Sequence, residues 1–296
     1  MSKFGGVGVA LVTPFSEKGQ IDFAGLERLI EHSIAGGVDY FVVQGTTGES
    51  PTLRMEEKRS LLDFILEVNK KRLPIVYGIG GNNTKVVCDL IRSMDLTGVS
   101  GILSVSPFYN KPSQEGIYQH YKRVAASTSL PIILYNVPAR TGSNMSAETT
   151  LRLAKDFANI TAIKEASGDL AQISDIIAKK PLDFEVISGD DALTLPLIAL
   201  GAEGVISVVA NAFPKPFSTM VNQALFGQIH VAKAIHYTLL DILKLLFVEG
   251  NPSGVKEALK HRGICGNGVR LPLIPVSEET SRAIYREMAE HDLVEV

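Results

Sequence analysis

Short apolar runs rich in β-branched residues recur along the chain at intervals of roughly 30 residues, the spacing expected of strand–helix repeats. Each run is followed by a polar turn and then by a segment with helical periodicity. The runs lie at 6–14, 40–47, 74–80, 101–107, 131–138, 160–167, 184–191 and 204–211. They are almost continuously apolar, which is typical of parallel strands that are buried on both faces. The pattern therefore predicts eight buried β-strands.

The segments between these runs have the pattern of amphipathic helices. In the first, Leu26, Leu29 and Ile30 lie on one helical face, and Asp22 stands where an N-cap is needed. Eight strand–helix units in residues 1–227 predict an α/β fold, a closed (β/α)8 TIM barrel. A doubly wound open sheet is the alternative, and it is disfavoured because no G-x-G-x-x-G motif follows any strand.

The strand pattern stops after residue 227, and residues 228–296 have the pattern of helices. The first of these helices is apolar on most sides, with leucines at positions 239, 240, 243 and 246. A helix of this kind must be covered by other parts of the protein. We expect 228–296 to form a C-terminal helical extension that packs on the barrel, and a second subunit could add further cover.

Composition and charge narrow the classes of function. The chain has 296 residues, with 29 Lys and Arg against 32 Asp and Glu, so its net charge is −3. Nucleic-acid binding calls for a clear excess of positive charge, so this charge argues against a nucleic-acid-binding protein.

The apolar segment 192–213 is interrupted by Glu203 and two glycines, which favours a helix followed by a strand over a membrane span. Two cysteines, Cys88 and Cys265, are too few for a disulfide scaffold. We expect a soluble, cytoplasmic protein.

Lys164 is the most informative polar residue, because it lies inside an otherwise apolar strand, ITAIKEAS. A barrel of this type carries its active site at the carboxyl ends of its strands. A buried, unpaired lysine is costly when charged, so it either pairs or becomes a neutral amine. A neutral amine there is a Schiff-base nucleophile for a carbonyl substrate. A structural salt bridge, for example with Glu165, is the alternative interpretation.

Several polar residues end the other strands or follow them. Tyr135 ends the strand before Lys164, where a phenol could move protons, although a buried core tyrosine is the alternative. Thr46 and Thr47 in GTTGES could cradle a carboxylate, or simply cap a helix. Arg140, in PARTG, could bind a second carboxylate or remain solvated.

Taken together, five segments resemble those of the dihydrodipicolinate synthase family. They are GTTGES (45–50), PFYNKPSQEG (107–116), YNVPARTG (135–142), IKEASGD (163–169) and GVISVVAN (204–211). The resemblance runs over essentially the whole chain. It implies condensation of pyruvate with L-aspartate 4-semialdehyde in the diaminopimelate route to lysine, by a homotetramer made of two tight dimers. It implies no metal and no organic cofactor.

The resemblance also assigns roles to residues. It implies that Lys164 forms the imine with pyruvate, and that Tyr135, Thr46 and Tyr109 form the proton relay. In this assignment Tyr109 reaches across the tight dimer interface into the neighbouring active site.

Binding roles come from the same resemblance. Thr47 and the backbone at Thr46 would hold the pyruvate carboxylate, and Arg140 would hold the carboxylate of the semialdehyde. Gly189 and the carbonyl group of Ile206 would complete the pocket.

Two other functions fit parts of the pattern. One is another pyruvate-dependent class I aldolase, of the N-acetylneuraminate lyase or 2-keto-3-deoxy-sugar-acid aldolase type, which would share Lys164 and Tyr135 but generally lacks the context of Arg140 and the tyrosine of the YN loop. The other is a catalytically silent barrel, which gives no reason for a buried amine beside a phenol.

Feedback inhibition by lysine should be weak or absent. In inhibited members of the family, lysine binds at the dimer interface, and the matching positions here are Met55, Lys58, Val86 and Phe108. Val86 removes a carboxylate partner for the ligand's ammonium group, and Lys58 adds a like charge. Each change should cost on the order of 1–3 kcal/mol of binding free energy. Inhibition by sub-millimolar lysine in a steady-state assay would contradict this prediction.

Overall fold

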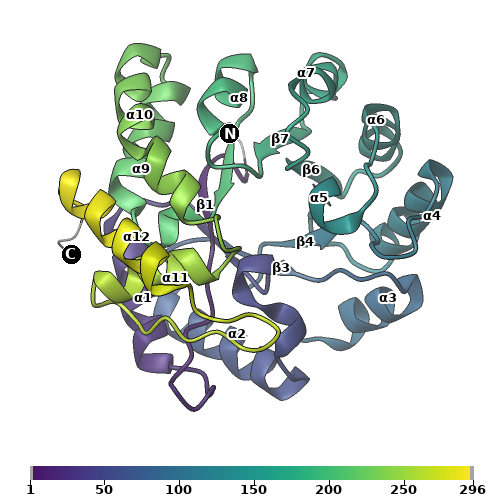
Figure 1. The fold of residues 1–296 in the computed structure, drawn as a ribbon. Helices are drawn as coiled ribbons and strands as arrows, with labels where there is room; N and C mark the ends of the chain where they lie inside the picture. The colour runs from purple at the N-terminus through teal and green to yellow at the C-terminus, as the bar shows by residue number, and fades with distance from the viewer. Residues whose placement is uncertain (1–2, 294–296) are drawn as a thin grey trace.

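The computed structural model describes residues 3–293, and its centre is a closed barrel of eight parallel strands. The strands are β1 (Gly6–Ala10), β2 (Tyr40–Val43), β3 (Ile75–Gly78), β4 (Gly101–Val105), β5 (Ile132–Asn136), β6 (Ile160–Glu165), β7 (Glu185–Ser188) and β8 (Gly204–Ser207). Each strand pairs with the next, and β8 pairs with β1 (Figure 1). The predicted TIM barrel is confirmed. The strands are shorter than the apolar runs, because the runs continue into the loops that follow them.

An outer ring of helices covers the barrel (Figure 1). Its members are α1 (Phe23–Ala35), α2 (Met55–Asn69), α3 (Thr84–Ser93), α4 (Gln114–Ala125), α6 (Ala147–Asp156), α7 (Leu170–Lys179), α8 (Thr194–Leu200) and α9 (Pro214–Leu225). The Asp22 carboxylate accepts a hydrogen bond from the backbone N–H of Gly25, so the predicted cap of α1 is confirmed. Short helical turns follow several strands at their carboxyl ends, namely η1 (Thr46–Gly48), η2 (Ser50–Thr52), α5 (Pro138–Thr141) and η3 (Val209–Asn211).

The side chains inside the barrel form a core separate from the one between strands and helices. Alternation along each strand sends one set of residues inward. The buried cluster inside the barrel comprises Phe4, Ala10, Tyr40, Val42, Val76, Leu103, Ile133, Tyr135, Val137, Ala162, Ile187 and Ile206. A side chain that enters this cluster is therefore surrounded largely by apolar groups.

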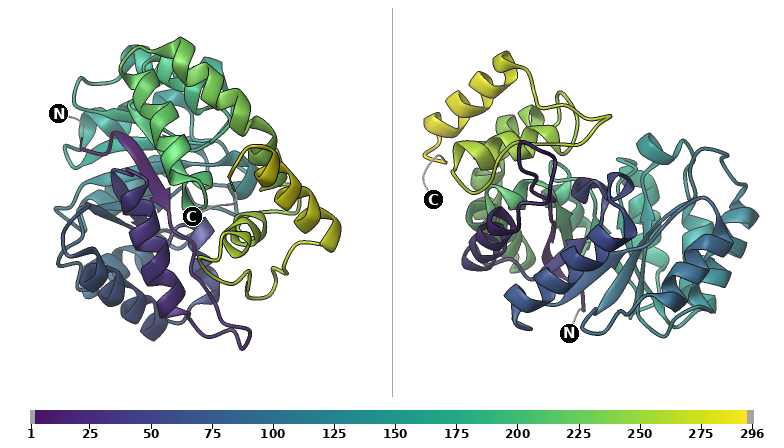
Figure 2. Two further views of the ribbon diagram at one scale, coloured as in Figure 1. Left: turned by 90° about the vertical axis from the view of Figure 1, so that its left-hand side faces the viewer. Right: turned by 90° about the horizontal axis from the view of Figure 1, so that it is seen from below.

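Between α9 and residue 293 the chain forms three more helices, α10 (Ile229–Leu245), α11 (Ser253–His261) and α12 (Glu278–Glu290). Helix α10 packs on α8 and α9, and α11 contacts α12 and η3. Figure 2 shows α11 and α12 at the opposite end of the barrel from the start of β1. The division of the chain into domains at residue 227 stays a prediction. Between residues 3 and 293 no helix is long and apolar enough to cross a membrane.

Gly204→Ala should destabilise the protein, because it affects the closure of the barrel. A Cβ atom at Gly204 would lie 2.2 Å from the carbonyl oxygen of Gly6, which is backbone of the neighbouring strand and cannot turn aside. Overpacking of this kind costs about 1–3 kcal/mol, so the thermal midpoint should fall by roughly 2–5 °C. Circular dichroism measures it, with Gly266→Ala as the matched control, since the nearest atom there is 3.7 Å away. Equal midpoints for the two variants would contradict the prediction.

Candidate active site

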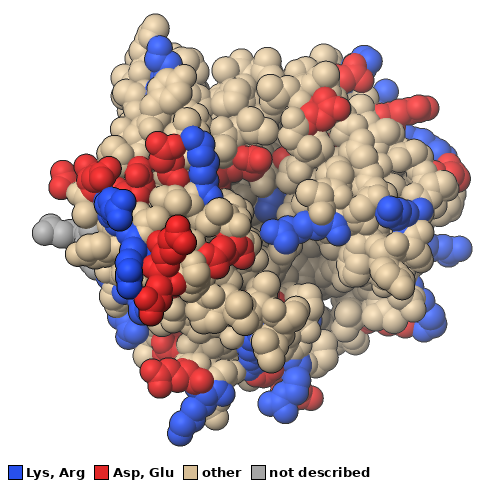
Figure 3. All heavy atoms as spheres, viewed as in Figure 1, with Lys and Arg blue, Asp and Glu red and all other residues tan. Residues whose placement is uncertain are grey.

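A cavity of about 440 Å³ opens at the carboxyl ends of β2 to β5 and extends toward α2 and α3. Figure 3 shows this face of the molecule hollowed near its centre. Of the predicted site residues, Thr46, Tyr135 and Arg140 line the cavity. Its wall also contains Lys58 but no aspartate or glutamate among the described residues. The cavity therefore offers positive charge and hydroxyl groups, which suits an anionic ligand.

Lys164 lies inside the barrel beside Tyr135. Register pairing places the two residues side by side on β6 and β5, and the Lys164 Nζ atom lies 4.6 Å from the centre of the Tyr135 ring. Lys164 is only 6% exposed. No carboxylate among residues 3–293 lies within ion-pair distance of its amine. The amine is buried and unpaired, as a nucleophilic lysine requires.

Glu165 does not pair with Lys164, although the two are adjacent in sequence. Its carboxylate accepts hydrogen bonds from Asn136 Nδ2 at 3.1 Å and from the backbone N–H of Ser167 at 2.8 Å. Burial raises the pKa of Glu165, and these hydrogen bonds oppose the rise. The alternative interpretation of Lys164 as half of a salt bridge with Glu165 is therefore wrong.

Gly189 leaves room for the lysine side chain. A Cβ atom at this position would lie 3.1 Å from Lys164 Cε and 2.7 Å from the Cβ atom of Ala166. The backbone N–H of Gly189 donates to the carbonyl oxygen of Glu165 at 2.7 Å, which fixes the loop after β7. Ile206, on β8, belongs to the cluster inside the barrel. Both predicted residues thus lie around the barrel interior, Gly189 directly against Lys164.

The two threonines lie on a tight segment, residues 46–52, that we call the threonine loop. Thr46 is exposed to the cavity, whereas Thr47 is buried. The Thr47 hydroxyl accepts a hydrogen bond from Asn251 Nδ2 at 3.0 Å. Asn251 comes from the C-terminal extension, and its contribution was not predicted from the sequence, because no local pattern marks an asparagine that acts across so long a stretch of chain.

Arg140 and Tyr109 lie at the edge of the site. Arg140 is exposed on α5 and lines the cavity. Tyr109 is 86% exposed, does not line the cavity, and has a left-handed backbone with φ of 74°. Within one chain the structure does not bring Tyr109 to Lys164 and Tyr135.

Two further polar side chains in the cavity wall were missed from the sequence. Gln44 and Tyr77 are buried, and the Gln44 amide atoms and the Tyr77 hydroxyl have no hydrogen-bond partner among the described residues. Burial raises the pKa of Tyr77 to about 12. Gln44 carried a usable signal, because it is a polar residue at the end of an apolar run, as Lys164 is. Its left-handed φ of 63° also marks a strained position beside the cavity.

Asp191 fixes the loop that follows β8. Its Oδ2 atom accepts hydrogen bonds from the backbone N–H groups of Val208 and Val209, both at 3.0 Å. The carboxylate is completely buried, and desolvation raises its pKa to about 6. No group of three histidine, cysteine or acidic side chains suited to a metal ion occurs between residues 3 and 293.

This arrangement defines a class of protein. A (β/α)8 barrel with a buried, unpaired amine beside a phenol at the carboxyl ends of its strands has the layout of a lyase or aldolase that works through a Schiff base. Comparison with known proteins narrows the class, because the sequence matches the Dihydrodipicolinate synthetase family over residues 3–291. The chain belongs to this family.

Individual relatives agree with this assignment. A 4-hydroxy-tetrahydrodipicolinate synthase from Parabacteroides distasonis is 51% identical over 287 residues, covering 96% of this chain and 97% of that protein. The dihydrodipicolinate synthase of Thermotoga maritima superposes with a TM-score of 0.95 at 41% identity, over 98% of this chain and 99% of that one. The chloride-inhibited synthase of Acinetobacter baumannii, complexed with pyruvate, gives 0.95 at 39% identity, over 99% and 100%. The family resemblance of the sequence motifs is confirmed.

Asp191→Asn should weaken the pH dependence of stability between about pH 4 and pH 6. The folded pKa of about 6 exceeds the ordinary value of 3.8, so the folded state binds this proton more tightly than the unfolded chain. The carboxyl group's contribution is therefore full below pH 4 and is lost as pH rises through 6, a loss on the order of 2–3 kcal/mol. Urea unfolding of both proteins at pH 4.5 and 7 measures the difference. The same pH dependence in variant and wild type would rule out the raised pKa.

Proposed function

We propose that this chain condenses pyruvate with L-aspartate 4-semialdehyde to give 4-hydroxy-tetrahydrodipicolinate, in the diaminopimelate route of lysine biosynthesis. The observation that carries the proposal is the buried, unpaired Lys164 amine, 4.6 Å from the centre of the Tyr135 ring, in a chain that is 51% identical to a synthase of this name. A lysine amine that no carboxylate occupies can attack the carbonyl carbon of a keto acid and form a Schiff base with it.

In the first half-reaction the Lys164 amine adds to the keto carbon of pyruvate. Loss of water from the adduct leaves an imine, in which the lysine nitrogen is doubly bonded to that carbon. Loss of a proton from the pyruvate methyl group then gives the enamine. The neighbouring phenol of Tyr135 is placed to move these protons, together with Thr46 and with Tyr109 from a neighbouring subunit. A phenol suits this task because, unlike a carboxylate, it brings no permanent charge.

In the second half-reaction the enamine carbon forms a bond to the aldehyde carbon of the semialdehyde, whose oxygen takes up a proton. The amino group of the semialdehyde then attacks the imine carbon. This closes the ring and releases the Lys164 amine unchanged. Over the cycle one water molecule is released and no electrons are gained or lost, so the condensation needs no oxidant or reductant.

Both substrates carry carboxylates, and the cavity suits them. Thr47 and the backbone N–H of Thr46 would hold the pyruvate carboxylate, and Arg140 would hold that of the semialdehyde. Gly189 and the carbonyl group of Ile206 would complete the pocket around the imine. The absence of acidic side chains from the described cavity wall supports two anionic substrates.

The assembly we propose is a homotetramer made of two tight dimers. The support is the exposure of apolar side chains beside the cavity. Met55 is 46% exposed, Val86 50%, Phe108 38% and Tyr109 86%. Together they would form an apolar surface on α2, α3 and the loop before α4, and burying it against a second copy is favourable. Cys88 and Cys265 are both buried and free, which fits our expectation of a cytoplasmic protein.

Reduction with borohydride in the presence of pyruvate should add mass at Lys164 alone. Reduction of the imine fixes the substrate to the lysine, so peptide mass spectrometry identifies the reactive amine. Lys164→Met should abolish the adduct and lower kcat/KM by at least about 10³-fold, since covalent catalysis is lost. The exposed Lys122→Met is the matched control and should behave like the wild type. A pyruvate adduct at any other lysine would contradict the proposal.

A coupled assay separates the synthase from the aldolase alternative. Turnover of pyruvate with aspartate semialdehyde should exceed turnover with sugar aldehydes, because Arg140 offers a partner for a carboxylate that sugars lack. Preference for a sugar aldehyde would favour the aldolase.

A further inference from the structure

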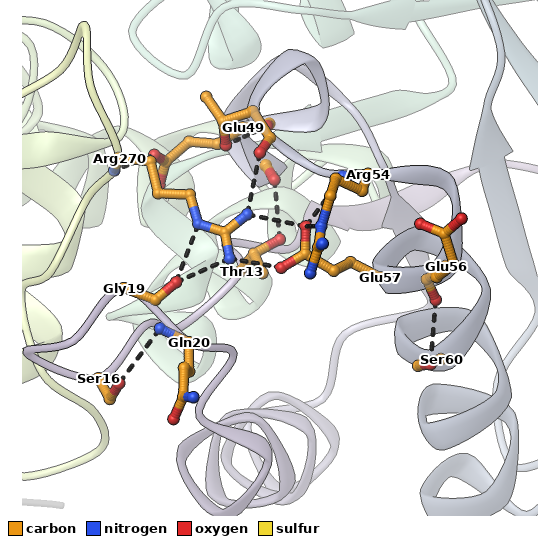
Figure 4. A network of polar contacts seen from close by, with 12 residues as sticks. Thr13, Ser16, Gly19, Gln20, Glu49, Arg54, Glu56, Glu57, Ser60 and Arg270 are labelled. Atoms are coloured by element: carbon orange, nitrogen blue, oxygen red, sulfur yellow. Dashed lines mark hydrogen bonds and ion pairs between the residues drawn. The ribbon is translucent and has the colours of Figure 1, made fainter.

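Three side chains of the C-terminal extension converge on the threonine loop. Asn251, Lys256 and Arg270 each contact a residue between positions 47 and 52. Figure 4 shows Arg270 together with Glu49 and Glu57, where the extension meets the barrel. These contacts join parts of the chain that lie more than 200 residues apart in sequence. A substrate-binding loop of the barrel is therefore held from outside the barrel.

The strongest of these contacts is a buried ion pair. Lys256 Nζ lies 2.5 Å from Glu49 Oε1, and both side chains are almost completely buried. The same ammonium group donates to the carbonyl oxygen of Gly268 at 2.7 Å. Glu49 has a left-handed backbone with φ of 52°, which is costly for a residue with a side chain. Lys256 thus holds the strained turn in the middle of the threonine loop, because the buried Glu49 carboxylate would be strongly destabilising without a partner.

Arg270 completes the attachment of this turn. Its backbone N–H donates to Glu49 Oε2 at 2.9 Å, and its guanidinium group donates to the carbonyl oxygens of Thr52 and Gly19 and to the Glu57 carboxylate. The hydrogen bonds from the Arg270 guanidinium group to the Glu57 carboxylate lower the pKa of Glu57 to about 2. One arginine therefore ties the threonine loop to helix α2 and to the loop after β1 (Figure 4).

Asn251 acts on the loop at the hydroxyl group of Thr47. Both side chains are buried, and Asn251 Nδ2 donates to Thr47 Oγ1 at 3.0 Å. A hydroxyl group has one proton to donate and two lone pairs to accept with. Because the asparagine supplies a proton of its own, the Thr47 proton is left free for a bond to another acceptor. The carboxylate of a substrate is such an acceptor.

We propose that Asn251 is a positioning residue that directs the Thr47 hydroxyl proton toward the substrate carboxylate, and that the Glu49–Lys256 pair and Arg270 fix the loop for this purpose. The inference rests on the proposed function, in which Thr47 binds pyruvate. The C-terminal extension then serves catalysis as well as stability, through a contact that is made to a binding residue and not to the reacting atoms.

Asn251→Asp tests this inference with almost no change of shape. An aspartate only accepts, so it captures the Thr47 proton and removes the donor from the site. The pyruvate concentration that half-saturates formation of the borohydride-trapped adduct should rise about 10- to 100-fold, the range for a hydrogen bond to a charged group. In a Thr47→Val background, Asn251→Asp should have little further effect, because its target is gone. A purely structural role would lower the thermal midpoint and raise half-saturation equally in both backgrounds, and that result would overturn the inference.

This experiment distinguishes a failure of the proposed function from a failure of the proposed role of Asn251. If the unmodified protein forms no adduct at Lys164, the proposed function is wrong. If the adduct forms with unchanged half-saturation in Asn251→Asp, only the role of Asn251 is wrong.

Lys256→Met provides a second test, of the ion pair. Loss of the partner of Glu49 should shift half-saturation for pyruvate in the same direction. Lys260→Met is the matched control, because this lysine lies on the same helix, is half-exposed and pairs with Glu257 at 3.2 Å. The control should leave half-saturation unchanged. Equal values for both variants would overturn the role of Lys256, and Asn251→Asp still decides the proposal if Lys256→Met fails to fold.

Discussion

The site depends on one constraint, which is that a primary amine is kept inside a closed barrel where no carboxylate of residues 3–293 pairs with it. The constraint follows from strand geometry. Successive residues of a β-strand face opposite sides, so Lys164 faces the barrel interior while Glu165 faces the other way. The amine and the carboxyl group are adjacent in sequence and are thus separated by the sheet itself. The Glu165 carboxylate is occupied instead by amide donors, which leaves the lysine unpaired.

The residues around the Lys164 amine are also fixed in position by the fold. Parallel register sets Tyr135 beside Lys164, and a closed sheet cannot slip that register without breaking its pairing elsewhere. Gly189 leaves room for the lysine, because a Cβ atom there would lie 2.7 Å from the Cβ atom of Ala166 and 3.1 Å from Lys164 Cε. Strand register and the close approach of the Gly189 backbone therefore fix where the lysine side chain lies. Such preorganisation spares the cost of arranging the site at the moment of reaction.

The sequence predicted those features whose signals are local. Eight apolar runs gave the barrel, and polar residues at their ends pointed to Lys164 and Tyr135. Asn251 could not be found this way, because its contact with Thr47 joins residues 204 positions apart and leaves no periodic trace. Gln44 had the same local signal as Lys164, but only its strained backbone and unpartnered amide reveal that it differs from an ordinary strand end. The predicted role of Tyr109 depends on a second chain and remains a prediction.

The barrel and the C-terminal extension both contribute residues around the site, so the site is not formed by the barrel alone. A boundary at residue 227 separates the strand–helix repeats from the helices that follow, which is a natural division of the fold. Contacts of the threonine loop cross this boundary, because the buried Glu49, which has a left-handed backbone, is paired with Lys256 of the extension. A barrel without the extension would keep the amine, but Glu49 would lose the Lys256 and Arg270 donors that hold its carboxylate in place. On this argument the barrel supplies the nucleophile, and the extension supplies the geometry that presents a substrate to it.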